Sequence, residues 1–446
     1  MEQYSRRDFL KVAGLAGGGL MMASASARAQ EAKKINPSEE MNVALVGMGA
    51  EGEVLLNSLL KIPGIRFRAV CDIWACRRRY ARGRILGGVK QELKDHLYED
   101  YKDLIANEKD LDAVVIATPD FWHSPQTVDF LKAGVNVYCE KMMSNTVEGA
   151  RKMVQAARET GKLLQIGHQR KSNPRYKFVR DVLLRENQLC GRLTGANAQW
   201  NRAVTKDLEV PAGKAFEISE ETLHKYGYKD KQQFRNWRWY KGLGGGPISD
   251  LGAHQIDIFA YMFGGRPKSV LAGGGNSFYK KDWYDDVMCI YEFDTFQGFP
   301  ARAFYQVLTT TSVGGYFEQF FGTDGSVKMS ENPALTKIFK ENGRPDLDEK
   351  WGSLVKNGVL VEREQAEVKT ADARESKPPK EYGFDIDIGK PIHMPHLENF
   401  FNAIRGKEKL NCDGEHAFEA EAAVYKVNEA VEAKKMLYFS DEDFKA

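Results

Sequence analysis

Asp250 and His254 stand four positions apart in the run of residues 244–257, which begins with three glycines. If this run is helical, the two side chains lie one turn apart on one face, where the carboxylate can orient the imidazole and stabilise its charged form. Imidazole is the side chain best suited to proton transfer near neutral pH. The pair therefore predicts an acid–base site. The alternative is an N-capping aspartate beside a packed histidine.

Two strand-like runs in the first third of the chain end in further reactive side chains. Residues 112–117 and 135–139 predict short, buried parallel strands. Groups that bind ligands on an open parallel sheet gather at the carboxyl ends of its strands. By itself a histidine there is more often a packing or capping residue, and a Glu-Lys pair an exposed charge pair. The candidates placed by these strand ends are Thr118, Pro119, His123, Glu140 and Lys141.

A glycine turn follows an earlier apolar run, residues 41–46, and precedes an amphipathic stretch over residues 53–60. In such a strand–turn–helix unit the first glycine permits the tight turn, and the second lets the backbone approach a pyrophosphate at the helix N-terminus. The third allows the helix to pack closely on the strand. We therefore expect dinucleotide contacts from the residues of this turn, namely Gly47, Gly49, Ala50, Glu51 and Gly52.

Asp72 follows the next predicted strand, residues 65–70, about twenty residues beyond the glycine turn. A carboxylate at this position can accept hydrogen bonds from the ribose hydroxyls of adenosine, and it repels a 2′-phosphate. NAD is therefore the predicted cofactor. NADP stays open, because Arg77, Arg78 or Arg79 could hold a phosphate if the loop folds back, although a solvated helix face is the commoner use of such residues.

The elements that position these residues follow from the wider pattern. Strand and helix patterns alternate from residue 30 to 166, which predicts an α/β domain with a doubly wound parallel sheet. The chain has 446 residues, of which 42% are apolar, enough for two hydrophobic cores. Its net charge of +2 gives no basic field for nucleic acid. Beyond residue 30 no apolar run approaches the length of a membrane span.

The first 29 residues are predicted to be an export signal. Arg6 and Arg7 stand in the run Ser-Arg-Arg-Asp-Phe-Leu-Lys, a weakly apolar stretch follows, and Ala27-Arg28-Ala29 has the small-x-small form of a cleavage site. This arrangement resembles a twin-arginine signal, which implies export of the folded protein to the periplasm by the twin-arginine machinery. The alternative is an amphipathic helix with two chance arginines. No cysteine stands at the cut, so no lipid anchor is expected.

The cysteine positions agree with folding before export. Three of the six lie in or at the ends of strand-like runs, and the others show neither paired nor metal-ligand spacing. Buried thiols are predicted, because a chain that folds in the reducing cytoplasm need not rely on disulfides. His393 and His396 are spaced like a metal pair but have no acidic or thiol partner nearby, so no metal site is predicted.

Nearly the whole chain after the signal resembles the glucose-fructose oxidoreductase and inositol 2-dehydrogenase family, often called Gfo/Idh/MocA. The resemblance rests on the glycine turn, the two strand ends and, most specifically, residues 244–257. It implies a Rossmann domain over residues 30–166. It also implies a C-terminal α+β domain over residues 167–446, which is built on a large, mainly antiparallel sheet and serves substrate binding and oligomerisation. A homo-oligomer is expected.

The sequence departs from the family at two positions. Met142 follows Glu140-Lys141 where many members have proline, so the peptide geometry after the lysine is open. His168 stands where asparagine is common, which bears on what is bound beside the nicotinamide. Neither change removes a reacting group.

Oxidation of a secondary alcohol needs a base for the hydroxyl proton while hydride passes to nicotinamide. We assign His254 as this base and Asp250 as its partner. Lys141 is assigned as the donor that hydrogen-bonds the substrate oxygen and favours its alkoxide character.

The predicted C-terminal domain contains strand-like runs at residues 193–199, 268–272, 286–293 and 301–308. Polar excursions over residues 203–234 and 342–391 are expected to shape a pocket mouth or cover a subunit contact. Sugars bind through aromatic faces and bidentate polar groups, although aromatic residues in such sheets are more often core. The candidate substrate contacts are His168, Arg170, Tyr176, Trp237, Arg238 and Tyr284.

Three functions fit these features. An exported enzyme must recycle its bound cofactor in place. A sugar or polyol oxidoreductase does so by oxidising one substrate and reducing another. A redox-neutral, NAD-dependent glycosidase does so by oxidising a hydroxyl, eliminating the glycoside and restoring the alcohol. The third function is non-catalytic sugar binding. The presence of Lys141, Asp250 and His254 argues against this third function, because a binder needs no base.

Overall fold

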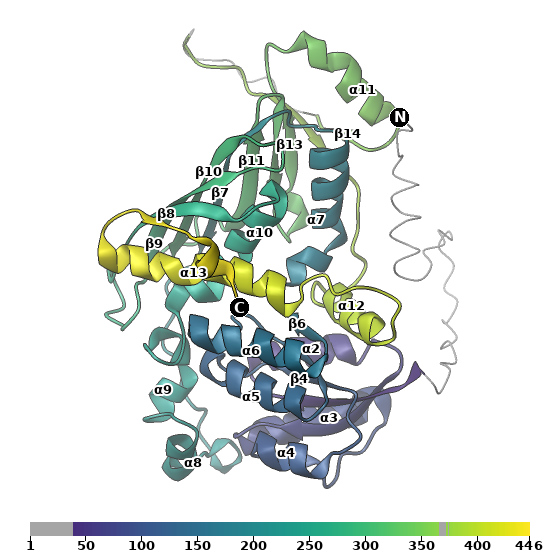
Figure 1. The fold of residues 1–446 in the computed structure, drawn as a ribbon, viewed down its shortest axis with the longest axis vertical. Helices are drawn as coiled ribbons and strands as arrows, with labels where there is room; N and C mark the ends of the chain where they lie inside the picture. Colours follow the sequence, from purple (N-terminus) through teal and green to yellow (C-terminus); the bar gives the residue numbers. More distant parts are fainter. Residues whose placement is uncertain (1–38, 365–371, 373) are drawn as a thin grey trace.

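The computed structural model describes residues 39–364, 372 and 374–446. The predicted export signal, residues 1–29, lies outside the described residues. The described chain forms one six-stranded and one ten-stranded sheet, each covered by helices (Figure 1). No helix in this part of the chain is long and apolar enough to cross a membrane.

The first sheet is a parallel Rossmann sheet with the strand order β3-β2-β1-β4-β5-β6. Its strands are β1 (Met41–Val46), β2 (Ile65–Cys71), β3 (Leu97–Tyr98), β4 (Ala113–Ile116), β5 (Asn136–Cys139) and β6 (Leu164–Ile166). The helices between them are α2 (Ala50–Leu59), α3 (Ala75–Val89), α4 (Tyr101–Asn107), α5 (Asp120–Lys132) and α6 (Val147–Thr160). The strand order reverses between β1 and β4, which creates a crevice for a ligand at the carboxyl ends of the strands. The predicted doubly wound sheet is confirmed.

Helices from the end of the chain complete the core of the first sheet. Helix α12 (Met394–Ile404) packs Leu397 and Phe400 against the apolar face of β1 and α2. The start of α13 (Gly414–Ala433) packs Phe418 into the core on the opposite face. The predicted boundary at residue 166 therefore separates the two sheets along the chain, but the hydrophobic core of the first sheet draws on both ends of the sequence.

The second sheet has the order β14-β15-β13-β12-β11-β7-β10-β9-β8-β16. Among these strands β7 and β10 pair in parallel and the other pairs are antiparallel, so the predicted large, mainly antiparallel sheet is confirmed. Its strands are β7 (Leu193–Asn201), β8 (Pro267–Gly275), β9 (Asp286–Asp294), β10 (Pro300–Leu308), β11 (Tyr316–Gly322), β12 (Gly325–Met329), β13 (Lys337–Lys340), β14 (Val361–Glu362), β15 (Lys380–Gly383) and β16 (Leu437–Tyr438).

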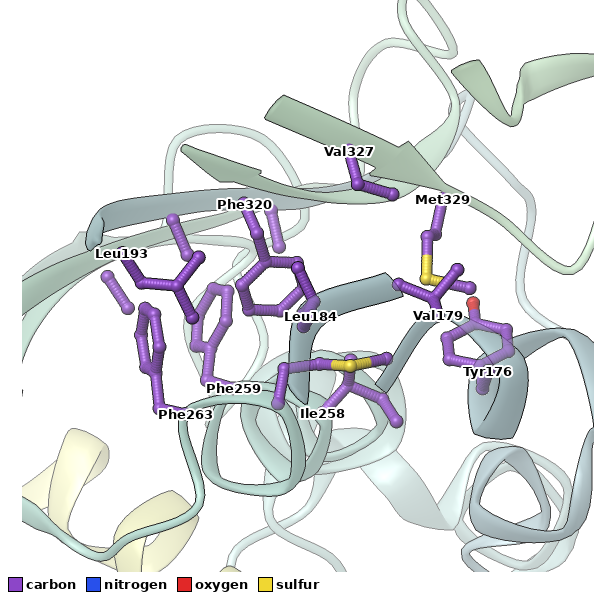
Figure 2. Close-up of a cluster of buried hydrophobic side chains, with 14 of the residues drawn as sticks. Tyr176, Val179, Leu184, Leu193, Ile258, Phe259, Phe263, Phe320, Val327 and Met329 are labelled. Atoms are coloured by element: carbon purple, nitrogen blue, oxygen red, sulfur yellow. The ribbon is translucent and has the colours of Figure 1, made fainter. Parts of the chain in front are cut away.

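One face of this sheet packs on helices. Figure 2 shows Phe259 and Phe263 of α10 (Ala253–Phe263) against Phe320 of β11, with side chains of helix α7 (Pro174–Phe178) and the π-helix Val179–Glu186 alongside. The strands alternate accordingly, as β9 does: Tyr291 and Phe293 point inward, while the neighbouring Ile290 is exposed. The packed face anchors α10, whose first turn carries His254.

The two predicted excursions lie at opposite ends of the molecule. Residues 203–234 contain α8 (Glu220–Lys225) and much of α9 (Lys231–Arg235), which lie beside the first sheet (Figure 1). Residues 342–391 contain α11 (Asp348–Lys356), which lies at the far end of the second sheet (Figure 1). The first excursion thus reaches the nucleotide crevice, as the prediction of a pocket-shaping segment requires.

The six cysteines are free thiols, as predicted. Five of them are buried and Cys76 is partly exposed. The core of each sheet therefore forms without cross-links.

Candidate active site

A single cavity of about 810 Å³ opens at the carboxyl ends of the first sheet and continues to the second sheet. This volume is in the upper part of the range that is usual for small-molecule sites. Its walls include the glycine turn, Asp72, Glu140 and Lys141 on one side and Asp250 and His254 on the other. The fold therefore brings the predicted cofactor and catalytic residues to one place.

The glycine turn has the geometry that a dinucleotide needs. Gly47 has φ +86°, and a Cβ added there would stand 2.7 Å from the backbone of Ala117 and Thr118. A Cβ at Gly52 would stand 2.1 Å from the carbonyl oxygen of Gly47. A Cβ at Gly49 would meet no atom within 4 Å, because this glycine faces the cavity. The turn therefore offers open space and the N-terminus of α2 to a pyrophosphate.

Asp72 holds the glycine turn and borders the cavity. Its carboxylate accepts hydrogen bonds from the backbone amides of Met48 at 2.6 Å and Trp74 at 2.7 Å. Burial raises the pKa of Asp72, although these two amides act in the opposite direction. Arg77 and Arg235 also line this part of the cavity. The carboxylate thus borders the cavity, together with two guanidiniums, at the position where a Rossmann site binds the adenosine ribose.

We expect Asp72→Ser to weaken NAD binding and to improve binding of NADP. The reason is that serine removes the repulsion of a 2′-phosphate and leaves Arg77 and Arg235 to receive it. The ratio of the dissociation constants for NADP and NAD measures the effect, and Asp95→Ser, an exposed carboxylate of the same domain, is the control. If the wild-type protein releases only NADP when it is denatured, our interpretation of Asp72 is wrong and the arginines already form a phosphate site.

The segments after β4 and β5 line the cavity. His123, which follows β4, lies at its wall and contacts two backbone carbonyl groups. Nδ1 of His123 lies 2.6 Å from the carbonyl oxygen of Met142, and Nε2 lies 2.6 Å from that of Thr118. Burial lowers the pKa of His123 to about 4. His123 therefore links the two strand-end loops, and both of its ring nitrogens point to protein rather than to the cofactor site.

Glu140 is almost fully buried at the edge of the cavity. Tyr138 donates a hydrogen bond to it at 3.0 Å. Burial and the neighbouring carboxylate of Glu51 raise the pKa of Glu140 to about 8. The raised pKa favours the protonated carboxyl of Glu140, which can donate as well as accept a hydrogen bond.

Lys141 and Asp250 form the centre of the site. Nζ of Lys141 donates to the backbone oxygen of Asp250 at 2.5 Å and stands 3.8 Å from its Oδ1. Nε of Arg238 donates to the same Oδ1 at 2.9 Å, and Arg202 is 3.8 Å from Oδ2. Burial alone would raise the pKa of Asp250, but Arg238 and Lys141 hold it below its usual range. The peptide after the lysine, Lys141-Met142, is cis.

His254 lies on the first turn of α10, directly after the π-helix Ile248–Gly252 that carries Asp250. Its Nδ1 is buried and has no hydrogen-bond partner among the described residues. Its ring packs 5.6 Å from that of Trp200. Burial and the positive charge of Lys141 hold the pKa of His254 well below its usual value. The imidazole is therefore neutral at neutral pH, as a general base must be.

The carboxylate of Asp250 does not orient the imidazole as predicted. It pairs with Arg238, Lys141 and Arg202 instead. The physical reason is that three positive charges compete for one carboxylate, while the pKa of His254 keeps its ring uncharged. Asp250 therefore fixes Lys141 and Arg238 at the site.

Of the six candidate substrate residues, Trp237 and Arg238 line the cavity, with the guanidinium 4.3 Å from the centre of the indole ring. His168 is buried at 3.0 Å from Glu421. Arg170 is buried against Glu318 and Glu331, and the hydroxyl of Tyr176 also binds Glu318. Tyr284 packs at the edge of the second core. His168, Arg170, Tyr176 and Tyr284 therefore do not line the cavity. The first three contact buried carboxylates, and Tyr284 packs against the hydrophobic core of the second sheet.

Other residues of the cavity wall were missed by the sequence analysis. Asp120 follows the β4 strand end directly, and burial raises its pKa to about 7. Its place after Thr118-Pro119 was a signal that could have identified it. Further members come from distant segments and have no local signal; they include Gln169, Trp200, Arg202, Tyr279, Tyr316, Glu331 and His393.

Comparison with protein-family models gives two matches. The model of the Gfo/Idh/MocA oxidoreductase family with an NAD-binding Rossmann fold matches residues 41–168. The model of the Gfo/Idh/MocA C-terminal domain matches residues 213–328. Together the two matches cover more than half of the sequence.

Two curated relatives share part of the sequence. The inositol 2-dehydrogenase of Rubrobacter xylanophilus is 35% identical over 148 residues, which are 33% of this chain and 40% of that protein. A glycosyl hydrolase family 109 protein of Saccharopolyspora erythraea is 28% identical over 171 residues, which are 35% of this chain and 37% of that protein. The chain thus spans less than half the length of either relative.

A solved structure shares the fold over nearly its whole length. It is a levoglucosan dehydrogenase in complex with NADH and L-sorbose, with 17% identity and a TM-score of 0.66. The match covers 91% of this chain and 100% of that one. The likeness extends over both sheets.

Proposed function

The chain belongs to the Gfo/Idh/MocA family of oxidoreductases, and we propose that it transfers hydride between a secondary alcohol of a sugar or polyol and a tightly bound nicotinamide cofactor. Its N-terminal domain is an NAD-binding Rossmann fold. The observation that carries the proposal is the meeting of Lys141, Asp250 and His254 in the cavity that begins at the glycine turn. Dehydrogenases of inositol and levoglucosan among the similar proteins support a sugar or polyol substrate.

The side chains of the site perform the proton chemistry. Nε2 of His254 takes the proton of the substrate hydroxyl, because Nδ1 is buried. Nζ of Lys141 keeps donors beyond its bond to Asp250 and gives one to the substrate oxygen as charge develops there. Bound NAD supplies the acceptor for the hydride that leaves the same carbon. The alcohol becomes a carbonyl, and the reverse sequence returns the proton from His254.

Trp200 and Trp237 support the choice of a sugar. Their rings line the cavity, and that of Trp200 lies beside His254. The faces of such rings match the apolar faces of sugar rings, while Arg202 and Arg238 offer donors to hydroxyls. The mixture of aromatic and guanidinium groups therefore suits a polyhydroxylated substrate.

A redox-neutral glycosidase is the second candidate. The relatedness to glycosyl hydrolase family 109 proteins favours it. In this reaction His254 and Lys141 would act as above while a hydroxyl is oxidised and its hydride passes to the bound cofactor. The aglycone would then leave by elimination and take up a proton, water would add in its place, and return of the same hydride would restore the alcohol. The same residues serve both reactions, so the substrate decides between them.

We also propose that the protein is exported to the periplasm by the twin-arginine machinery and works as a homo-oligomer. The arginine pair and the small-x-small site support export. Exposed Leu271, Met288 and Ile290 on the outer face of the second sheet support association with a second copy. Export of a folded holoprotein would in turn require that the nucleotide is retained.

The function is tested on the exported protein as purified. We expect NAD among the nucleotides released by denaturation, and we expect native protein given one oxidisable sugar to reduce its bound cofactor once and stop, as read from nicotinamide absorbance. A second sugar that accepts hydride should restart turnover in the oxidoreductase, whereas an aryl glycoside should be cleaved continuously by the glycosidase. Protein that is empty of nucleotide and reduces free NAD through many cycles would contradict the retained cofactor and leave an ordinary dehydrogenase.

A further inference from the structure

Residues 203–240, called the crossing segment from here on, leave the second sheet and pack on the first domain (Figure 1). They share a small hydrophobic core with it, in which Leu223, Tyr226 and Tyr228 of the segment belong to the same cluster as Trp74. Leu223 is fully buried and Trp74 is 3% exposed. A core of this kind fixes the segment to the Rossmann domain rather than leaving it as a surface loop.

Hydrogen bonds fix the same contact. Nε1 of Trp74 donates to the carbonyl oxygen of Phe216 at 2.9 Å, and Nε1 of Trp122 donates to that of Tyr226 at 3.2 Å. Arg79 donates to the carbonyl oxygen of Ala215 at 2.6 Å. The donors come from the loops and helices after β2 and β4, which flank the adenosine half of a Rossmann site.

The segment also forms part of the cavity wall. Tyr226, Tyr228, Phe234 and Arg235 line the cavity that Asp72 borders. The ring of Phe234 lies 5.6 Å from that of Trp74 at 77°, and the guanidinium of Arg235 lies 5.2 Å from the centre of the same ring. Flat aromatic and guanidinium groups are what a purine base stacks on.

We propose that the crossing segment completes the adenosine subsite, so that the adenosine half of the dinucleotide is enclosed between the two domains and leaves only when the segment detaches. This inference rests on the proposed function, since it concerns the cofactor of that reaction. The glycine turn and Asp72 contact the dinucleotide from one side, and the crossing segment covers it from the other. The cover would explain how an exported enzyme keeps its nucleotide.

The test weakens the anchor without touching the cavity. Leu223 belongs to the shared core but does not line the cavity, so Leu223→Ala loosens the segment without removing any lining side chain. Leu354→Ala is the matched control, a buried leucine of α11 at the far end of the second sheet. Each variant is loaded with NADH, mixed with excess NAD, and followed by the loss of bound NADH fluorescence.

We expect Leu223→Ala to release NADH about tenfold faster than the wild type or more, and Leu354→Ala to release it at the wild-type rate. Phe234→Ala, which removes one edge of the cover, is a second variant in case Leu223→Ala does not fold. Wild-type release rates in folded Leu223→Ala or Phe234→Ala would overturn the proposal. Release from the wild type as fast as mixing would also overturn it. If such a protein still transferred hydride from a sugar to added NAD, the proposed oxidoreductase activity would stand, but the retained cofactor would not. Slow release of NADH by a protein that transfers no hydride to any sugar would support the enclosed adenosine subsite and contradict the proposed function.

Discussion

Replacement of His254 by alanine is expected to lower turnover by about two to four orders of magnitude, because the variant lacks the group that takes the substrate proton. Lys141→Ala is expected to lose a similar factor, since the developing alkoxide loses its charged donor. Nucleotide content should stay close to that of the wild type in His254→Ala, because this residue contacts the substrate side of the cavity. Single-turnover reduction of the bound cofactor measures the effect directly.

The pH dependence gives a second measure of the same assignment. A base must be neutral to act, so its activity falls as the pH drops through its pKa. Burial, Lys141 and Arg170 hold the pKa of His254 well below its usual value, so wild-type activity should persist as the pH falls below about 6.5. Near-wild-type turnover in both alanine variants would remove these residues from the mechanism.

The glycine turn and the strand ends could be predicted because neighbours in the chain fix them. An apolar run, a turn and an amphipathic helix follow one another within residues 41–59. The positive φ of Gly47 belongs to the turn itself, and a Cβ at Gly52 would meet the carbonyl oxygen of Gly47 in the same unit. The carboxyl ends of β4 and β5 then meet the turn by the ordinary topology of a parallel sheet.

The roles of Asp250 and His254 could be predicted only in part. A spacing of four places two side chains on one face of an α-helix. Asp250 lies instead in a π-helix, whose hydrogen bonds span five residues, so this stacking does not apply across the junction with α10. Lys141 and Arg238 then take the carboxylate, and Lys141 is 109 positions away in the chain. No local pattern contains that pairing.

The position of the crossing segment could also be predicted only in part, for a different reason. Its polar composition predicted a long excursion, and the structure places that excursion over the nucleotide crevice. The anchor residues Leu223, Tyr226 and Tyr228 are separated by a histidine, a lysine and a glycine, so they give no continuous apolar run. Their partner, Trp74, is the residue directly before α3 in the first domain, far from them in the chain. The sequence therefore indicated a segment able to shape a pocket, but not which half of the pocket.

Arg170 was a candidate substrate contact, and its surroundings make it a structural residue with a large expected effect. Its guanidinium is buried against the carboxylates of Glu318 and Glu331, which are 148 and 161 positions further along the chain. We expect Arg170→Ala to lower the free energy of unfolding by about 3–5 kcal/mol, because it leaves two buried carboxylates without their cation. The midpoint of urea unfolding measures the loss.

Two comparisons distinguish this effect from that of any lost ion pair. Arg302→Ala breaks an exposed pair with Glu292 on the open face of the second sheet and should cost less than about 1 kcal/mol. The loss in Arg170→Ala should also grow with pH. Burial already raises the pKa of Glu318, and removal of Arg170 raises it further, so the folded variant holds a proton that the unfolded chain releases above the usual glutamate pKa. Stability is then highest in mild acid and declines as the pH rises towards the folded-state pKa. An unchanged unfolding midpoint in Arg170→Ala, combined with a raised KM for sugar, would return this arginine to the substrate site.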